Sequence, residues 1–313
     1  MIRIGLIGCG EHAEVGHAVP LSRYQTAHPD EVVLAAACDL REDRAQLFCT
    51  KYGFERPYTS AEEMLAKESL QACIAVVPVD QISRVATKLL ESSIPCVIEK
   101  PLGATPAEIQ ALRETARRTG TRNMVSVNRR FMPFLNKGLE WVRGRGGLRY
   151  VRALMTRVAR TELDFLTTTA VHSVDALRYI GGDVESSEIH PLHGSSDTYW
   201  FAIDLQFESG AIGRVDVMPT AGVVEETYEL YGDGFRVVVT APFGPKRGLW
   251  CYEGNALVLH ESEDEVPEDV IAGFYDETTE LVNAIEQGRA MSPSIADVAP
   301  SMELCHTLAQ KLR

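Results

Sequence analysis

The sequence predicts an α/β doubly wound parallel sheet followed by an α+β domain with a large, mainly antiparallel open sheet. In the first 124 residues, short β-rich runs alternate with helical patterns, which is typical of parallel βαβ units. After about residue 128, longer alternating strands are separated by turn residues, as in hairpins. The chain has 313 residues, and at roughly 150 residues per domain this length suggests two domains. We expect them to cover residues 1–124 and 125–313.

The strands of the first domain are short apolar runs. We expect them at Ile2 to Ile7, Val32 to Cys38, Ala72 to Val76, Cys96 to Ile98 and Met124 to Val127. Apolar residues at helical spacing predict helices over residues 43–52, 81–91 and 105–119. The third helix begins with a capping-box pattern, in which Thr105 is followed by Pro106 and Glu108.

The second domain shows the alternation of half-buried strands. We expect strands over residues 149–158, 199–207, 213–217, 224–231, 235–239, 249–252 and 256–260. Helical patterns cover residues 170–180 and 269–287, and each ends at glycine. A last helix is expected over residues 296–312, and the sequence does not assign it to either domain.

Composition and charge exclude several classes of function. Apolar residues make up 45% of the chain and charged residues 24%, as in an ordinary globular protein. The 44 acidic and 31 basic residues give a net charge of −13, which repels nucleic acids and anionic membrane surfaces. No apolar run approaches the ~20 residues that span a bilayer. The first strand begins at Ile2 without a secretory leader, and the seven cysteines form no CxxC pair, so we expect a cytoplasmic protein with reduced thiols.

A glycine-rich turn follows the first strand. Gly8, Gly10 and Ala13 fit the pattern GxGxxA and open a helical segment, which is the context that dinucleotide binding requires. The backbone of the turn, which includes Glu11 and His12, would face the pyrophosphate. Asp39 ends the second strand, where a carboxylate binds the adenosine ribose and repels a 2′-phosphate, so NAD is favoured. Arg41 keeps NADP as the alternative.

An acid, a base and a proline end the fourth predicted strand. Glu99, Lys100 and Pro101 lie at the carboxyl edge of the sheet, where open α/β sheets bind ligands. A lysine beside the nicotinamide can bind a substrate hydroxyl and help to remove its proton. This segment therefore indicates alcohol or ketone chemistry.

These motifs resemble the glucose-fructose oxidoreductase, inositol dehydrogenase and MocA-like (Gfo/Idh/MocA) oxidoreductases. The resemblance covers nearly the whole chain and rests on the turn at Gly8, Asp39, the Glu99–Pro101 triplet and the segment from Asn128 to Phe131. It implies a Rossmann domain, a substrate-binding second domain and a homo-oligomer, either a dimer or a tetramer, formed through the large sheet. It also implies residue roles: Lys100 in catalysis, Pro78, Glu99 and Asn128 in cofactor binding, and Arg129 in substrate binding.

The family also carries an aspartate and, four residues later, a histidine on the first helix of the second domain. Here His172 fits the histidine, but Thr168 stands at the aspartate position. His172 remains a candidate acid/base, and Thr168 a substrate-binding hydroxyl. Asp175 is spaced to reach His172, with Arg178 or solvent as its alternatives. Phe274 falls where family members often have a tyrosine, and we expect it to pack against apolar groups.

The sequence therefore predicts an NAD(P)-dependent oxidoreductase that transfers a hydride between the nicotinamide and a secondary alcohol or ketone of a sugar, cyclitol or related polyol. Two alternatives remain open: a glycosidase or lyase that oxidises its substrate transiently with NAD, and a non-catalytic dinucleotide-sensing regulator. The absence of the aspartate favours the regulator, and Lys100 argues against it. The sequence has no HExxH motif and no cluster of cysteine and histidine, so we expect no metal site.

Overall fold

The computed structural model describes residues 1–192, 200–262 and 266–312. It divides the chain into two compact units: Met1–Val127 with Phe274–Pro300, and Asn128–Gly273 with Ser301–Arg313. The boundary expected from the sequence lay at residues 124 and 125. The structure differs in that residues 274–300 return to the first unit, where Pro293 accepts a hydrogen bond from the backbone N–H of Val125. Such a return depends on long-range pairing that local patterns do not encode.

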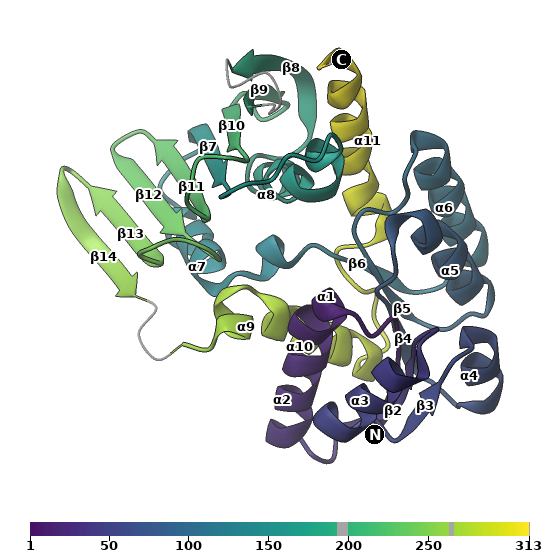
Figure 1. Cartoon of the computed structure of the whole chain (residues 1–313). Coiled ribbons are helices and arrows are strands. Elements are labelled where there is room, and N and C mark those ends of the chain that lie inside the picture. Colours follow the sequence, from purple (N-terminus) through teal and green to yellow (C-terminus); the bar gives the residue numbers. More distant parts are fainter. Residues whose placement is uncertain (193–199, 263–265, 313) are drawn as a thin grey trace. The chain divides into compact units, whose positions relative to one another are not determined.

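The first unit contains a parallel sheet of six strands (Figure 1). The strands are β1 (Ile2–Ile7), β2 (Val32–Cys38), β3 (Arg56–Tyr58), β4 (Ala72–Ala75), β5 (Cys96–Glu99) and β6 (Asn123–Ser126). Their order is β3-β2-β1-β4-β5-β6, which is the doubly wound dinucleotide-binding order and confirms the predicted fold class. β3 was not predicted because it has only three residues, Arg-Pro-Tyr, and lacks an apolar run.

Helices connect these strands or pack beside them. They are α1 (Glu11–Ala13), the π-helical segment η1 (Glu14–Ala18), α2 (Val19–Ala27), α3 (Glu42–Tyr52), α4 (Ala61–Lys67), α5 (Val79–Glu91), α6 (Pro106–Thr119) and α10 (Phe274–Glu286). The capping box of α6 is confirmed, since Thr105 and Glu108 each bind the other's backbone N–H. α10 packs against α2, and Figure 1 shows the two side by side.

The second unit contains an eight-stranded sheet in the order β14-β13-β12-β11-β7-β10-β9-β8. The strands are β7 (Leu148–Thr156), β8 (Val184–Leu192), β9 (Trp200–Phe207), β10 (Ile212–Met218), β11 (Glu225–Gly232), β12 (Phe235–Thr240), β13 (Gly248–Glu253) and β14 (Ala256–Ser262). Neighbouring strands run antiparallel except β7 and β10, so the mainly antiparallel sheet is confirmed. Residue 199, where we expected the second strand of this domain to begin, lies outside the described residues.

Short helices accompany this sheet. They are the 3₁₀ segment η2 (Asn128–Phe131), α7 (Pro133–Val142), the π-helical segment η3 (Leu166–Ala170), α8 (Val171–Gly181) and α9 (Glu268–Ile271). α7 packs on β12 and β13, and α8 packs on β7 and β10. α11 (Ile295–Lys311) begins in the first unit and ends in the second.

The helix expected over residues 269–287 is wrong as a single element, because it breaks between α9 and α10. Gly273 adopts a φ of +84°, which side-chain-bearing residues rarely adopt. A Cβ at this glycine would lie 2.3 Å from the backbone oxygen of Asn128. Asn128 Nδ2 also donates a hydrogen bond of 2.7 Å to the oxygen of Ala272. The break is therefore fixed by a close backbone approach between distant segments.

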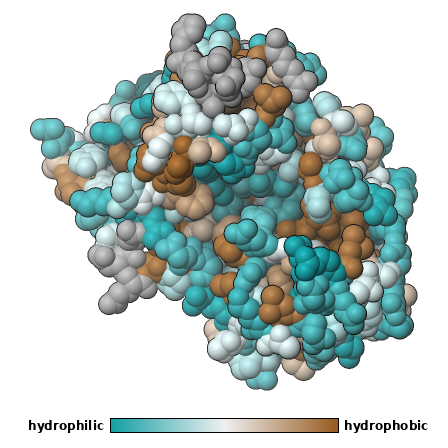
Figure 2. Space-filling view, in the orientation of Figure 1, coloured by the Kyte–Doolittle hydropathy of each residue, from teal (hydrophilic) through white to brown (hydrophobic). Residues whose placement is uncertain are grey.

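Exposed apolar side chains are scattered. On the face shown in Figure 2 they form small groups among hydrophilic side chains. Within the described ranges, no helix is both long and apolar enough to cross a membrane.

We predict that Gly273→Ala destabilises the protein more than Gly288→Ala. Both glycines have a left-handed backbone, so each substitution costs roughly 1–2 kcal/mol of conformational energy. Of the two positions, only Gly273 would place the added Cβ within 4 Å of other backbone atoms. This overlap should add about 1–3 kcal/mol to the loss of unfolding free energy. Urea unfolding of both variants measures the difference, and equal unfolding free energies would contradict the role given to the Asn128 contact.

Candidate functional site

The two glycines of the glycine-rich turn differ in the space around them, since a side chain would clash at Gly8 but not at Gly10. Gly8 has a φ of +95°, and a Cβ there would lie 1.8 Å from the backbone oxygen of Val76. Gly10, the N-cap of α1, is extended, and its Cβ would meet nothing within 4 Å. Gly8 therefore makes the tight turn, while the space beside Gly10 is open to a ligand that approaches the backbone.

Asp39 is held beside this turn by two backbone groups. Its Oδ2 accepts a hydrogen bond of 2.8 Å from the N–H of Cys9, and its Oδ1 accepts one of 2.9 Å from the N–H of Arg41. The Arg41 guanidinium is directed to the carboxylate of Asp43, at 2.6 Å. Asp39 thus stands where a carboxylate binds the adenosine ribose, and the arrangement favours NAD.

A cavity of about 730 Å³ lies at this edge of the sheet, within the range of about 300–1,000 Å³ typical of ligand sites. Gly8, Gly10, Asp39 and Pro78 all line it. Four basic side chains also face it: Arg41, Arg44, Arg84 and Lys88. The residues present therefore fit a dinucleotide, because they combine an open phosphate-binding turn, a ribose-binding carboxylate and local positive charge in an acidic protein.

Glu99 connects the glycine-rich turn to the end of β5. It is 3% exposed, and its Oε1 accepts hydrogen bonds from Nε2 of His12 at 3.0 Å and of His17 at 2.9 Å. Its Oε2 accepts the backbone N–H of Lys100 at 3.1 Å. Burial opposes ionisation, but the two histidines hold the pKa of Glu99 well below its usual value. The half-buried Lys100 therefore follows a strand end that is fixed to the turn carrying His12.

A second buried acid, Glu277, lies close enough to Glu99 for the two charges to interact. Glu277 of α10 is 2% exposed, and its Oε2 accepts a hydrogen bond of 3.0 Å from the Ser126 hydroxyl. Burial and the charge of Glu99 raise the pKa of Glu277 well above its usual value. Phe274, at the start of α10, is buried, and its ring packs edge-on against His12, which is not one of the apolar groups that we expected. No local pattern indicated His17 or Glu277, because helix packing brings each of them to this site.

In the second unit, His172 lies buried in the first turn of α8. Thr168 lies in η3, and its hydroxyl donates to the backbone oxygen of Asp164 at 2.9 Å. Asp175 binds Arg130 through two hydrogen bonds, at 2.7 and 2.8 Å, and also accepts one from Ser301. The interpretations that turned Asp175 to Arg178 or to solvent are therefore wrong, and its carboxylate is committed to Arg130.

Asn128 and Arg129 lie in a buried polar cluster of the same unit. Arg129 Nε and one Nη donate to the two oxygens of Glu226, at 3.0 and 2.7 Å. Its other Nη donates to Oδ1 of Asn128 at 2.8 Å. Glu226 also accepts from Arg157, and although burial opposes ionisation, the two guanidinium groups lower its pKa to about 2. Glu226 and Arg157 were not predicted as site residues, because isolated charged residues in alternating strands usually face solvent.

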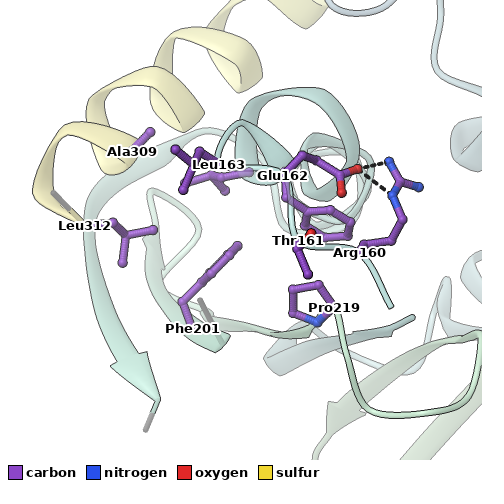
Figure 3. Close-up of a pocket in the computed structure, with 10 residues that line it drawn as sticks. Arg160, Thr161, Glu162, Leu163, Phe201, Pro219, Ala309 and Leu312 are labelled. Atoms are coloured by element: carbon purple, nitrogen blue, oxygen red, sulfur yellow. Dashed lines mark hydrogen bonds and ion pairs between the residues drawn. The ribbon is translucent and has the colours of Figure 1, made fainter. Parts of the chain in front are cut away.

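A smaller pocket of the second unit is mainly apolar. It has about 190 Å³ and is lined by residues of the 160–166 segment, β9 and α11 (Figure 3). Its charged side chains, Arg160 and Glu162, pair with each other. The lining offers few hydrogen-bonding groups for a polyol, so we place no substrate there.

We predict that Gly10→Ala keeps the fold and weakens dinucleotide binding. The added methyl group has space in the protein, so the unfolding free energy should change by less than about 0.5 kcal/mol. It occupies the space that a pyrophosphate needs, so the Kd for NADH should rise by about tenfold or more in fluorescence titrations. Gly8→Ala is the matched contrast, because it overlaps the Val76 carbonyl and should lower stability instead. An unchanged Kd for Gly10→Ala would exclude the turn as the phosphate site.

We predict that Glu277→Gln stabilises the protein increasingly as pH rises. Between the usual pKa of glutamate and the raised pKa in the fold, the native state binds one more proton than the unfolded state, so stability falls by up to about 1.4 kcal/mol per pH unit. Glutamine removes this dependence. Urea unfolding between about pH 5 and pH 8 measures it. Glu286→Gln, an exposed change on the same helix, is the control, and parallel profiles for wild type and Glu277→Gln would contradict the assignment.

The comparisons with known proteins agree with this geometry. Residues 2–128 match the family described as the oxidoreductase family, NAD-binding Rossmann fold. The chain is similar to myo-inositol 2-dehydrogenase of Thermotoga maritima, with 26% identity over 233 residues, covering 69% of this chain and 68% of that protein.

Solved structures share the whole fold. A Gfo/Idh/MocA family oxidoreductase from Vibrio cholerae superposes with a TM-score of 0.85 at 19% identity, covering 100% of this chain and 98% of the other. A levoglucosan dehydrogenase in complex with NADH and levoglucosan superposes with a TM-score of 0.83 at 16% identity, again covering 100% and 98%. Residues 2–128 thus match the NAD-binding Rossmann domain of this oxidoreductase family, and the whole chain shares the fold of a Gfo/Idh/MocA oxidoreductase.

Proposed function

We propose that this protein is an NAD-dependent dehydrogenase that acts on a secondary alcohol, or on the corresponding ketone, of a sugar, cyclitol or related polyol. The observation that carries the proposal is the hydrogen bonding of Glu99 to His12, which fixes the strand that precedes Lys100 to the glycine-rich turn. The relatives that act on myo-inositol and levoglucosan support the substrate class.

In this proposal each residue has one task. Bound NAD supplies a hydride acceptor for the carbon that carries the reacting hydroxyl. Lys100 binds that hydroxyl and takes its proton, and His172 assists the proton transfer. Thr168 offers a hydroxyl to the substrate in place of the family's carboxylate. Arg129 supports the substrate pocket by holding Asn128 and Glu226, since its three nitrogens already donate to them.

We predict that Lys100→Ala lowers kcat/KM by about 10²- to 10⁴-fold, because it removes the group that binds and deprotonates the hydroxyl. The measurement is NADH absorbance with a panel of sugars, sugar acids, cyclitols and polyols, in both directions. Lys67→Ala is the matched control, since Lys67 is an exposed lysine that pairs with Glu63.

Two results would contradict the proposal. One is the absence of any NADH change with wild-type protein across the panel, and the other is equal activity of Lys100→Ala and Lys67→Ala. Turnover of a glycoside without net NADH would instead support the transient-oxidation alternative.

We also propose that the protein works in the cytoplasm as a homo-oligomer paired through its large sheet. All seven cysteines are free thiols, as a reducing compartment maintains. One face of the sheet carries a cross-strand row of charges, in which Arg214 binds both Asp204 and Asp216, and Asp216 binds Arg152. A row of alternating charges is self-complementary and suits a two-fold interface.

A further inference from the structure

Within the second unit, one buried cluster carries more positive than negative charge. Arg129 and Arg157 share the single carboxylate of Glu226, so the three groups sum to one positive charge. Their side chains are 6%, 9% and 0% exposed. Tyr228, whose hydroxyl donates to Glu226 at 3.1 Å, stays neutral, because burial and the Glu226 charge raise its pKa. A buried charge without a counter-ion is costly, so a second anion would stabilise this cluster.

Three described acids of the second unit, Glu225, Asp175 and Asp216, do not supply that second anion. Glu225 precedes Glu226 on β11, and successive strand residues point to opposite faces of a sheet. In agreement, Glu225 accepts a hydrogen bond from Thr227, which is on its own face of the strand. Asp175, on α8, already binds Arg130. Asp216 binds Arg152 and Arg214.

The two arginines differ in how many of their nitrogens donate hydrogen bonds. Each nitrogen of Arg129 donates to Glu226 or Asn128. Arg157 donates through one Nη to the backbone oxygen of Thr156 at 2.7 Å and through the other to Glu226. Its Nε has no acceptor among the residues that the structure describes. The two guanidinium groups therefore share the excess charge, and the Nε of Arg157 is a donor that a ligand could use.

The cluster lies beside Phe243 and beside α8. Both guanidinium groups lie over the ring of Phe243, at 5.7 Å for Arg129 and 5.2 Å for Arg157, and this ring is 41% exposed. On another side, Ser173 of α8 lies close enough to Tyr228 to influence the pKa of the Tyr228 hydroxyl. Ser173 directly follows His172. The excess charge thus lies between an exposed aromatic ring and the helix that carries the proposed acid/base.

We propose that this cluster binds a carboxylate of the substrate, so that the preferred substrates are sugar acids or related hydroxy acids and not neutral polyols. A carboxylate oxygen would accept the Nε–H of Arg157 in a charge-assisted hydrogen bond, and its charge would neutralise the surplus. The net charge of −13 repels anions from most of the surface, so an acidic substrate requires a local cationic group of this kind. This inference rests on the proposed dehydrogenase function and narrows its substrate class.

The test compares matched pairs of neutral and acidic substrates: D-glucose with D-glucuronate, D-galactose with D-galacturonate, and D-glucitol with D-gluconate. We expect kcat/KM for the preferred acid to exceed that of its neutral partner by about 10- to 100-fold, as for a charge-assisted hydrogen bond. Arg157→Gln should remove most of this ratio, and Arg157→Lys should restore part of it. Arg149→Gln, which changes an exposed arginine, is the matched control and should keep the ratio.

Thermal unfolding measures the binding of the sugar acid without turnover. The preferred sugar acid should raise the unfolding temperature of wild-type protein more than its neutral partner does, and Arg157→Gln should lose this difference. If neutral polyols are oxidised, while the acids are neither oxidised nor stabilising, the inference is overturned and the dehydrogenase function stands. If no compound is oxidised but an acid stabilises through Arg157, the proposed function fails and the anion site stands. No oxidation and no stabilisation by any acid would overturn both.

Discussion

The buried carboxylate of Glu99 is the interaction on which the first unit depends. It ties His12 of the glycine-rich turn and His17 of the following helix to the strand that precedes Lys100. Ionised carboxylates are costly to bury, and here hydrogen bonds from the two histidines offset that cost. The turn and the strand end are therefore held as one piece, which the proposed alignment of a dinucleotide with a substrate oxygen requires.

In the second unit, a buried carboxylate is likewise bound by two basic side chains, which here are arginines. Glu226 is buried between Arg129 and Arg157, as Glu99 is between two histidines. Both arginines stay protonated at all physiological pH values, so together they exceed the single negative charge of Glu226. The arginine centre therefore keeps a permanent surplus of positive charge. In a protein with a net charge of −13, this is the kind of local field that attracts an anion.

Several elements were predictable because their signals are local. The capping box at Thr105, the glycine pattern at Gly8 and Gly10, and the apolar face of α5 each act within about a dozen residues. β3 and α7 were missed because each depends on its neighbours more than on its own pattern. The break at Gly273 was missed for the same reason, since the residue it approaches, Asn128, is far away in the sequence.

The sequence by itself determined the fold class, the dinucleotide-binding turn, the acid at Asp39 and the lysine at the end of β5. Strand periodicity, turn residues and short motifs carry that information, and they act between residues close in the chain. Tertiary structure alone decided which charges meet: Glu99 with His17, Asp175 with Arg130, and Glu226 with two arginines. These partners are 45 to 97 residues apart, and only the packed fold brings them within hydrogen-bond distance, because the energy of a buried ion pair exists only once water has been excluded.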